Sequence, residues 1–333
     1  MSRISLFLPS FALFISLSAT CNAAEHIYSL TERSKLSASG EMTFLVRFPN
    51  GRIFYEDAKD REEYRVRGVL AVCIWSTDAK VVEGYLKAKG KFSSLVQFAD
   101  KNNLALISWT NPKGYKIGVS GDEMDPSEYR KELRVYDRRA RDWENGYKRL
   151  CKKYNLPEHN LMAYGMSGGA QTLHRLAMRF PEYFHAIHIH INSSYDLVEE
   201  EGKSALWLVT TGTREYGYPA GIRFYESARS KGYHMIFRAE ENLGHNDSAA
   251  TRKLSRAFFD YSLQFLPDAR NPDWVGSPKE RFTLMQHPAF IGDHINSEVF
   301  KADAAAQYMD QDVMVPLPTE EIAKAWGTIL NLE

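Results

Sequence analysis

One serine of this 333-residue chain stands in a setting that could make its hydroxyl a nucleophile. Residues 160–170 read NLMAYGMSGGA, so Gly165, Ser167 and Gly169 form a Gly-x-Ser-x-Gly pattern between a strand-like and a helix-like run. The two glycines permit a tight strand-to-helix turn that a Cβ would crowd. Such a turn would aim the Ser167 hydroxyl out of a sheet and set the Gly168 amide beside it as an oxyanion donor. The alternative is a glycine-rich helix start that binds phosphate.

A serine hydroxyl is a poor nucleophile without a base, and we expect His245 to be that base. Among the ten histidines, His245 follows the last strand-like run and precedes a long helix-like run. Its loop should therefore lie at the same end of a parallel sheet as the Ser167 turn. In the chain order serine, acid, histidine the base also comes last. His287 and His294 follow the serine as well, but they belong to the C-terminal tail.

Three further histidines, His185, His188 and His190, lie on or next to a single strand-like run. Strand alternation puts His188 and His190 on one face, where the pair could bind a metal. No other ligand spacing supports such a site. We therefore expect packed, hydrogen-bonded histidines there and neither a metal nor an organic cofactor.

A third residue should orient the imidazole of His245 and stabilise its cation. Glu215 lies in the loop after the next-to-last strand-like run, where an acid would be presented at the same sheet edge. Asp196, after the preceding strand, is the competing candidate. Asp247 is close to His245 in sequence, but we expect it to point elsewhere. Without such a role, Glu215 would form a salt bridge with a nearby arginine such as Arg214.

A second oxyanion donor should come from the loop after the strand-like run 68–75, from the backbone amide of Trp75 or Ser76. Residues 74–78 read IWSTD and lack the glycines that are usual at this position, but a backbone donor requires no particular side chain. Aromatic residues at predicted strand ends could line a substrate pocket, although ordinary packing is their commoner role. They are Trp75, Trp109, Tyr164, Tyr216 and Tyr218.

The elements that must position these residues alternate along the chain from about residue 42. Apolar runs predict strands at residues 42–48, 68–75, 104–109, 160–165, 186–191, 205–210 and 234–239. Amphipathic runs predict helices at residues 92–102, 136–154, 169–179, 222–231 and 251–266. Several strands are almost continuously apolar, as expected when helices cover both faces. The fold class is therefore α/β, with a mostly parallel central sheet and right-handed crossovers.

The two ends of the chain differ from this region. Residues 1–24 place Arg3 before a short apolar run and end in small residues, which predicts a cleaved signal peptide and a secreted or periplasmic protein. The apolar run is shorter than the roughly 20 residues that a membrane anchor needs, so we expect no integral membrane span after cleavage. We expect residues 25–266 to form the catalytic domain and residues 267–333 an extension packed on it, with a strand near 289–291 and a helix at 320–326.

The composition limits which binding partners the protein can have and which redox states its cysteines can adopt. Lys and Arg number 42, Asp and Glu also 42, and this zero net charge argues against nucleic acid or an anionic membrane as the main partner. A hydrophobic fraction of 44% is sufficient for a large core. Cleavage of the signal peptide would remove Cys21, for which lipid modification is a lesser alternative. We expect Cys73 and Cys151 to be buried thiols, although an exported protein could join them.

Over residues 42–266 the chain resembles the serine hydrolases of the α/β-hydrolase fold. The Ser167 turn and residues 179–186, RFPEYFHA, resemble a branch of secreted esterases that includes feruloyl esterases, acetylxylan esterases and polyhydroxyalkanoate depolymerases. The resemblance implies a carboxylic ester hydrolase that acts on a small-molecule or polymer ester and requires no cofactor. The rival interpretations are a serine peptidase of the same fold and a non-catalytic, hydrolase-like binding protein.

The same resemblance bears on individual residues. Gly212-x-x-Glu215 corresponds to the Gly-x-x-Asp acid turn of the branch, and Gly244-His245 to its base. A glutamate thus stands in place of the usual aspartate. At the oxyanion position, residues 75–76 read Trp-Ser in place of the common His-Gly.

Overall fold

The computed structural model describes residues 26–33, 41–55, 65–111, 126–266, 280–305, 307 and 313–330. The predicted signal peptide at residues 1–24, with Cys21, lies outside the described residues. None of the helices within those ranges combines the length and the apolar character that a bilayer span needs.

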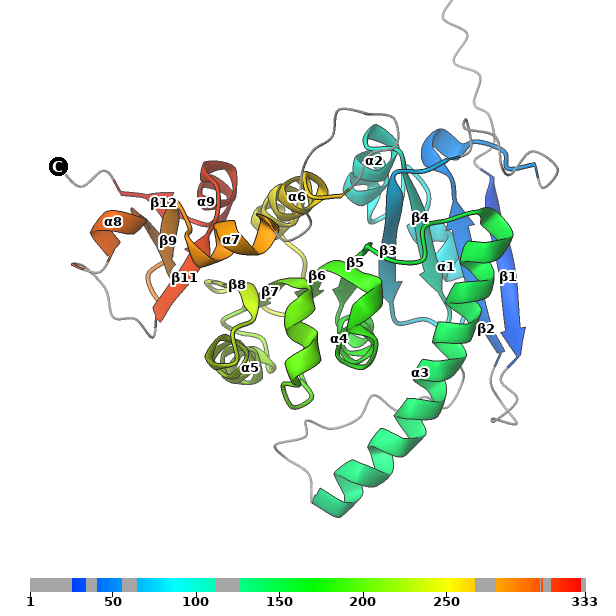
Figure 1. Ribbon diagram of the computed structural model, residues 1–333, viewed down its shortest axis with the longest axis horizontal. Coiled ribbons are helices and arrows are strands. Elements are labelled where there is room, and N and C mark those ends of the chain that lie inside the picture. The colour runs from blue at the N-terminus through cyan, green and yellow to red at the C-terminus, as the bar shows by residue number, and fades with distance from the viewer. Residues whose placement is uncertain are drawn as a thin grey trace, which may run out of the picture.

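The main body is built on an eight-stranded sheet with the strand order β1-β2-β4-β3-β5-β6-β7-β8 (Figure 1). Strand β2 runs antiparallel to both of its neighbours, β1 and β4, and every other pair in this sheet is parallel. The strands are β1 (Ile27–Arg33), β2 (Glu41–Arg47), β3 (Gly68–Ile74), β4 (Leu104–Trp109), β5 (Leu161–Met166), β6 (Phe184–His190), β7 (Leu206–Gly212) and β8 (His234–Glu240).

The predicted α/β class and mostly parallel sheet are confirmed. Strands β2 to β8 all coincide with predicted strands, whereas β1 was not predicted. The central strands β4 to β7 are buried along their whole length, which explains why their sequences are nearly continuous apolar runs.

Helices cover both faces of the sheet, with α2 and α6 on one face and α3, α4 and α5 on the other (Figure 1). The α-helices of the main body are α1 (Ala79–Tyr85), α2 (Ser93–Lys101), α3 (Pro126–Tyr154), α4 (Gly168–Arg179), α5 (Tyr218–Ser230) and α6 (Ala249–Leu263). Short 3₁₀ turns occur at Pro49–Gly51, Pro181–Tyr183 and Glu200–Ser204. Helix α3 begins well before its predicted start at residue 136, because the charged residues of its first turns carry no apolar repeat.

Beyond the main body, the C-terminal segment forms a second, smaller sheet of order β11-β9-β10-β12. Its elements are α7 (Glu280–Gln286), β9 (Phe290–Asp293), β10 (Glu298–Lys301), α8 (Ala302–Ala305), β11 (Met314–Leu317), α9 (Glu320–Trp326) and β12 (Thr328–Ile329). Helix α9 coincides with the helix predicted at 320–326, and β9 overlaps the strand predicted near 289–291. Strands β10, β11 and β12 were not predicted.

This segment packs beside β8 (Figure 1), and hydrogen bonds from buried side chains join it to β8 and α5. The indole N–H of Trp326 donates to the Phe237 carbonyl of β8 at 2.7 Å, and the Arg238 guanidinium lies 5.3 Å from the Trp326 ring. On α5, the Tyr225 hydroxyl donates to the Met314 carbonyl at 2.7 Å. Trp326 and Tyr225 are fully buried, so both contacts are shielded from water.

Trp326→Ala should lower the free energy of unfolding by about 3 to 5 kcal/mol, because it leaves a cavity and removes the hydrogen bond to Phe237. Urea unfolding followed by circular dichroism measures this change. Trp326→Phe is the control, since it keeps most of the apolar contact and should cost less. An unchanged unfolding curve for Trp326→Ala would contradict the seating of the C-terminal segment on β8.

Candidate active site

The turn between β5 and α4 holds Ser167 in a strained backbone conformation, with φ 55° and ψ −130°. The Ser167 N–H donates to the His190 carbonyl at the end of β6, at 3.0 Å. Both flanking glycines are required by close backbone contacts. A Cβ on Gly165 would lie 2.8 Å from the Ala170 Cα, and one on Gly169 would lie 2.1 Å from a β3 carbonyl oxygen. This geometry exposes the serine side chain at the carboxyl edge of the sheet.

The structure brings Ser167, His245 and Glu215 together in one hydrogen-bonded chain. His245 Nε2 lies 2.8 Å from Ser167 Oγ, and His245 Nδ1 lies 3.0 Å from Glu215 Oε1. The carboxylate can only accept, so it selects the tautomer with a proton on Nδ1 and leaves Nε2 to accept from the serine hydroxyl. The Glu215 side chain is only 7% exposed, whereas that of His245 is 54% exposed. The acid is therefore shielded and the base is open to solvent.

Backbone contacts fix the acid loop against the base loop. Gly212 ends β7 so close to residue 243 that a Cβ there would lie 2.0 Å from the Leu243 carbonyl oxygen. That same carbonyl accepts from the Arg214 N–H at 3.0 Å. At Gly217, two residues after Glu215, a Cβ would lie 2.3 Å from the Asn192 carbonyl oxygen. The requirement for glycine at position 217 was not predicted, although a glycine two residues after the candidate acid was the available signal.

The two competing carboxylates are engaged elsewhere. Asp196 pairs with Arg175 of α4 at 3.0 Å, and its backbone N–H donates to a histidine of the same helix. Asp247 pairs with Arg252 of α6 at 2.7 Å. Of the three acids considered, Glu215 is the one that contacts His245.

The candidate oxyanion donors lie on adjoining backbone segments. Gly168 is the first residue of α4, so its N–H has no intrahelical acceptor. The missing Cβ of Gly169 would lie within 2.7 Å of the Ile74 Cα, which brings the end of β3 beside the serine turn. Trp75 and Ser76 follow directly, and the Asn111 N–H donates to the Ser76 carbonyl at 2.7 Å. This contact fixes the backbone of the loop that carries the second candidate donor.

The aromatic residues proposed for a substrate pocket divide into two groups. Trp109 is only 1% exposed and packs against Trp143 at 5.5 Å between ring centroids, so the structure places it in the core and not at the site. Tyr164 is also buried. Tyr216, next to Glu215, is 80% exposed, and Tyr218 is half-buried. The expectation for Trp109 failed because a residue at a strand end can still face a covering helix, here α3.

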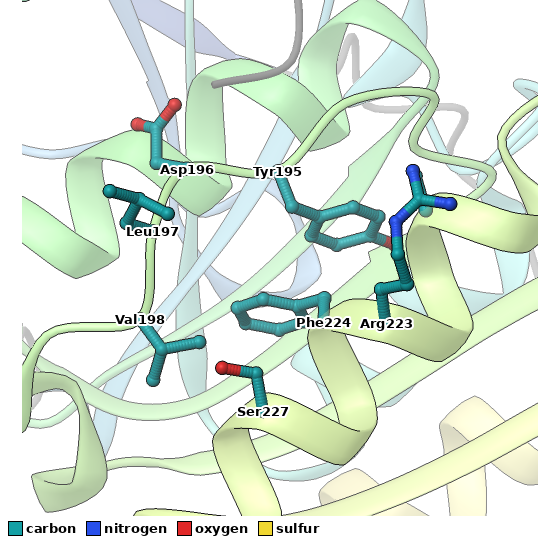
Figure 2. Close-up of a pocket in the computed structure, with 8 residues that line it drawn as sticks. Tyr195, Asp196, Leu197, Val198, Arg223, Phe224 and Ser227 are labelled. Carbon is teal, nitrogen blue, oxygen red and sulfur yellow. The ribbon is translucent and has the colours of Figure 1, made fainter. Parts of the chain in front are cut away.

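A cavity of about 180 Å³ lies away from the serine, between residues 195–198 and α5 (Figure 2). Tyr195 and Phe224 stack within it, with ring centroids 4.6 Å apart. Its wall is tied through Asp196 to Arg175, roughly 12 Å along α4 from the serine at 1.5 Å per residue. Ser167, Glu215 and His245 are not among the residues that line this cavity.

Both cysteines among the described residues are buried free thiols. Burial raises the pKa of Cys73 well above its ordinary value and that of Cys151 to about 12, so neither is a reactive thiolate at neutral pH. Within the described ranges, no three His, Cys, Asp or Glu side chains are grouped so that they could hold a metal ion.

The histidines of β6 and α4 are buried and hydrogen-bonded. His185 Nε2 contacts the Ser262 carbonyl at 2.8 Å, and His188 contacts hydroxyls on both sides of its ring. His174 of α4 accepts from the Asp196 backbone N–H at 2.9 Å. Burial lowers the pKa of His174 and that of His190 to about 4, and it also lowers the pKa of His188 well below its ordinary value. These three rings are neutral at pH 7.

Comparison of the sequence with protein-family models and with curated proteins gives no match. Among solved structures, a ferulic acid esterase shares 15% identity, with 66% of this chain and 91% of the other covered and a TM-score of 0.45. The poly(3-hydroxybutyrate) depolymerase LpqC from Bordetella parapertussis shares 16% identity over 74% of this chain and 92% of its own, with a TM-score of 0.46. A putative dipeptidyl aminopeptidase IV from Bacteroides ovatus shares 9% identity over 73% of this chain and 36% of its own, with a TM-score of 0.49.

The chain's own topology defines its class. A parallel sheet with the antiparallel strand β2 beside β4, and a strained serine turn between the central strand β5 and helix α4, constitute an α/β-hydrolase fold. The resemblance inferred from the sequence is thus confirmed at the level of fold. The similar structures include esterases and peptidases, and their functions belong to those proteins.

Stability should fall as the pH is lowered from about 6.5 to 4. His174, His188 and His190 are mostly neutral in the folded chain at pH 5, while the unfolded chain binds a proton at each. Because folding depresses their pKa values, their contribution is complete above pH 6.5 and is lost on acidification, by roughly 2 kcal/mol at pH 5 for each of His174 and His190, whose pKa values are about 4. Urea unfolding at pH 7 and pH 5 measures the loss. His174→Gln should reduce this pH dependence, and an unaltered dependence in that variant would count against the assignment.

Proposed function

We propose that the chain is a serine hydrolase, and specifically a carboxylic ester hydrolase that works through an acyl-enzyme. The observation that carries this proposal is the hydrogen-bonded chain from Ser167 through His245 to the shielded Glu215 at the carboxyl edge of the sheet. A nucleophile, a base and an acid in this order are what a hydroxyl needs in order to attack a carbonyl carbon at neutral pH.

In the first half of the reaction, Ser167 Oγ attacks the ester carbonyl and passes its proton to His245 Nε2. Glu215 stabilises the imidazolium through the Nδ1–H bond. The carbonyl oxygen becomes an oxyanion, which accepts from the Gly168 N–H and from the backbone amide of Trp75 or Ser76. His245 then protonates the alkoxide oxygen, the carbon–oxygen bond breaks, and the alcohol leaves.

In the second half, water attacks the acyl-serine carbonyl and gives a proton to His245. The tetrahedral intermediate collapses, the acid leaves, and the proton on His245 returns to Ser167 Oγ. All of these steps use protein groups and water alone, so the mechanism calls for no cofactor.

The site is exposed to solvent, which favours a substrate that the protein does not have to enclose. The His245 side chain is half exposed, and Tyr216 beside the acid is 80% exposed. We propose Tyr216, with Tyr218, as a contact for the substrate near the acid loop. The substrate is then either a small ester or an ester group on a polymer. The signal-like residues 1–24 support a secreted or periplasmic location, and we propose residues 25–266 as the catalytic domain with residues 267–333 as its extension.

A fluorophosphonate probe, which labels activated serines, should modify the wild-type chain and fail to modify Ser167→Ala. Intact-mass spectrometry measures the added group and locates it. Ser193→Ala is the matched control, because Ser193 is exposed on the neighbouring loop and bears no part in the proposed chemistry. Absence of labelling in the wild type would favour the non-catalytic binding protein.

The leaving group then separates the two hydrolase interpretations. Turnover of p-nitrophenyl esters, with little on aminoacyl-p-nitroanilides, supports the esterase, and the reverse preference identifies a peptidase. A panel of acetylated sugars, feruloylated sugars and aliphatic polyesters would define the natural acyl group.

Glu215→Gln should lower kcat by roughly two to four orders of magnitude, because the amide no longer fixes the Nδ1–H tautomer or stabilises the cation of His245. Steady-state hydrolysis of a p-nitrophenyl ester measures the loss. The matched control is Asp196→Asn, which disturbs the pair with Arg175 outside the site and should leave kcat within about twofold. Near-normal turnover by Glu215→Gln would refute its role as the acid.

A further inference from the structure

The chain turns away from the sheet at a strained residue directly after β6. Ile191 has a φ of 52°, in the left-handed region that β-branched residues rarely adopt. Its side chain is fully buried, and its N–H still donates to the Thr210 carbonyl of β7 at 2.9 Å. Strain of this kind persists only where the surrounding contacts hold it, and it is concentrated at functional sites. The turn at Ile191 therefore calls for a functional explanation.

The carbonyl groups on either side of Ile191 show what the turn does. The His190 carbonyl accepts from the Ser167 N–H at 3.0 Å, on the β5 side of β6. In an extended strand of a parallel sheet, the carbonyl two residues later would point to the same side. The Asn192 carbonyl instead faces the loop after β7, where a Cβ on Gly217 would lie 2.3 Å from its oxygen. The left-handed residue thus redirects the backbone from the nucleophile turn to the acid loop.

The side chain of Asn192 folds back on the segment that follows it. Its amide N–H donates to the Ser194 carbonyl at 2.6 Å, and its Oδ1 lies 3.4 Å from the Ser194 backbone nitrogen. Only 1% of Asn192 is exposed, so water does not compete for these contacts. Asparagine side chains that bond to the backbone two residues further on commonly close tight turns. The amide therefore holds the Asn192 carbonyl in place against Gly217.

The same segment is bound to α4, the helix that begins at the nucleophile turn. The side-chain amide of Gln171 donates to the Ser194 hydroxyl, and the backbone N–H of Asp196 donates to His174 Nε2 at 2.9 Å. The backbone N–H of Gln171 in turn donates to the Ser167 carbonyl at 3.1 Å. The segment after β6 is therefore fixed relative to the serine turn itself.

The acid loop is supported on both sides of Glu215. Before the acid, the backbone N–H groups of Thr213 and Arg214 donate at 3.0 Å to carbonyls of β8 and of the loop after it. After the acid, Gly217 lies directly against the Asn192 carbonyl. The first contacts join the acid to the base loop. The second contact joins the acid to the segment that is bound to the nucleophile helix.

We propose that Asn192 is a positioning residue for Glu215. Its amide and the left-handed Ile191 hold the Asn192 carbonyl against Gly217, and they thereby set the position of the acid loop relative to α4. The proposal rests on the proposed function of Glu215 as the acid. Asn192 itself does not contact the reacting atoms and acts through Glu215.

Steady-state hydrolysis of a p-nitrophenyl ester tests this role. Asn192→Ala should lower kcat by about 10- to 100-fold with KM within about twofold, because a displacement of about 1 Å can cost up to 100-fold. Asn192→Ser should recover part of the loss, since a serine hydroxyl can still accept from the N–H two residues further on. Gly217→Ala should also lower kcat, because the added Cβ would displace the Asn192 carbonyl.

The matched control is Asn103→Ala. Asn103 directly precedes β4, at the edge of the sheet opposite to the candidate site. Its side chain also donates one hydrogen bond and accepts another, to the Arg65 carbonyl at 2.9 Å and from Arg52 at 2.8 Å. The same substitution with the same number of lost bonds should leave kcat within about twofold.

A second comparison tests whether the effect passes through the acid. In a Glu215→Gln background the acid is already lost, so adding Asn192→Ala should lower kcat by no more than about twofold, since groups that act as a unit are not additive. A general disturbance of the fold would lower kcat by the same factor in both backgrounds.

Urea unfolding gives a readout that does not depend on activity. Asn192→Ala and Gly217→Ala act on the same contact, so the double variant should shift the unfolding midpoint by less than the sum of the two separate shifts. Asn103→Ala combined with Gly217→Ala should give the full sum.

Each result decides a separate point. Equal kcat in Asn192→Ala and Asn103→Ala would overturn the positioning role, as would an undiminished effect in the Glu215→Gln background. If Asn192→Ala fails to fold, wild-type kcat in both Asn192→Ser and Gly217→Ala would overturn it instead. A wild type that labels with no fluorophosphonate and cleaves no ester would refute the proposed function, while the urea comparison would still accept or reject the contact between Asn192 and Gly217.

Discussion

The backbone of Ser167 is held at positive φ, a conformation that costs a serine about 1 to 3 kcal/mol, and much of the surrounding architecture keeps it there. Gly165 and Gly169 are necessary because β3 and the first turn of α4 approach within the space of one methyl group. The hydrogen bond to the His190 carbonyl fixes the turn from the β6 side. The protein can maintain this strained turn because the turn follows β5, which lies among the most deeply buried strands of the sheet.

The same edge of the sheet imposes the positions of the other two groups. Parallel strands present the loops that follow them at one end, so β5, β7 and β8 deliver Ser167, Glu215 and His245 to neighbouring places although they are far apart in sequence. Close backbone contact at Gly212 then locks the loop after β7 to the loop after β8. The difference in exposure follows from this packing, since the acid lies beneath the histidine.

Much of this could be predicted because it depends on local pattern. The apolar runs of the parallel strands and the glycines around Ser167 are visible in the sequence, and chain order singled out His245. What failed depends on contacts between elements, which the pattern within one element does not show. Strand β1 (Ile27–Arg33) reads IYSLTER, too polar to predict a strand, and it forms because β2 pairs with it. Trp109 was misplaced because the sequence of β4 does not show which of its side chains the next helix, α3, covers, and Trp143 of that helix packs on the Trp109 ring. The strands of the C-terminal sheet are too short to show a period of two.

The hydrogen bond from Trp326 to β8 has a further consequence for the association of chains with one another. An edge strand has unpaired backbone N–H and C=O groups that can bind a strand of another chain. Exposed edge strands therefore promote aggregation. Here the carbonyl of Phe237, on the outermost strand β8, is already occupied by an indole N–H from the same polypeptide. Of the strands described, β1 lies at the opposite end of the strand order. It is then the edge strand to which a strand of another chain could add.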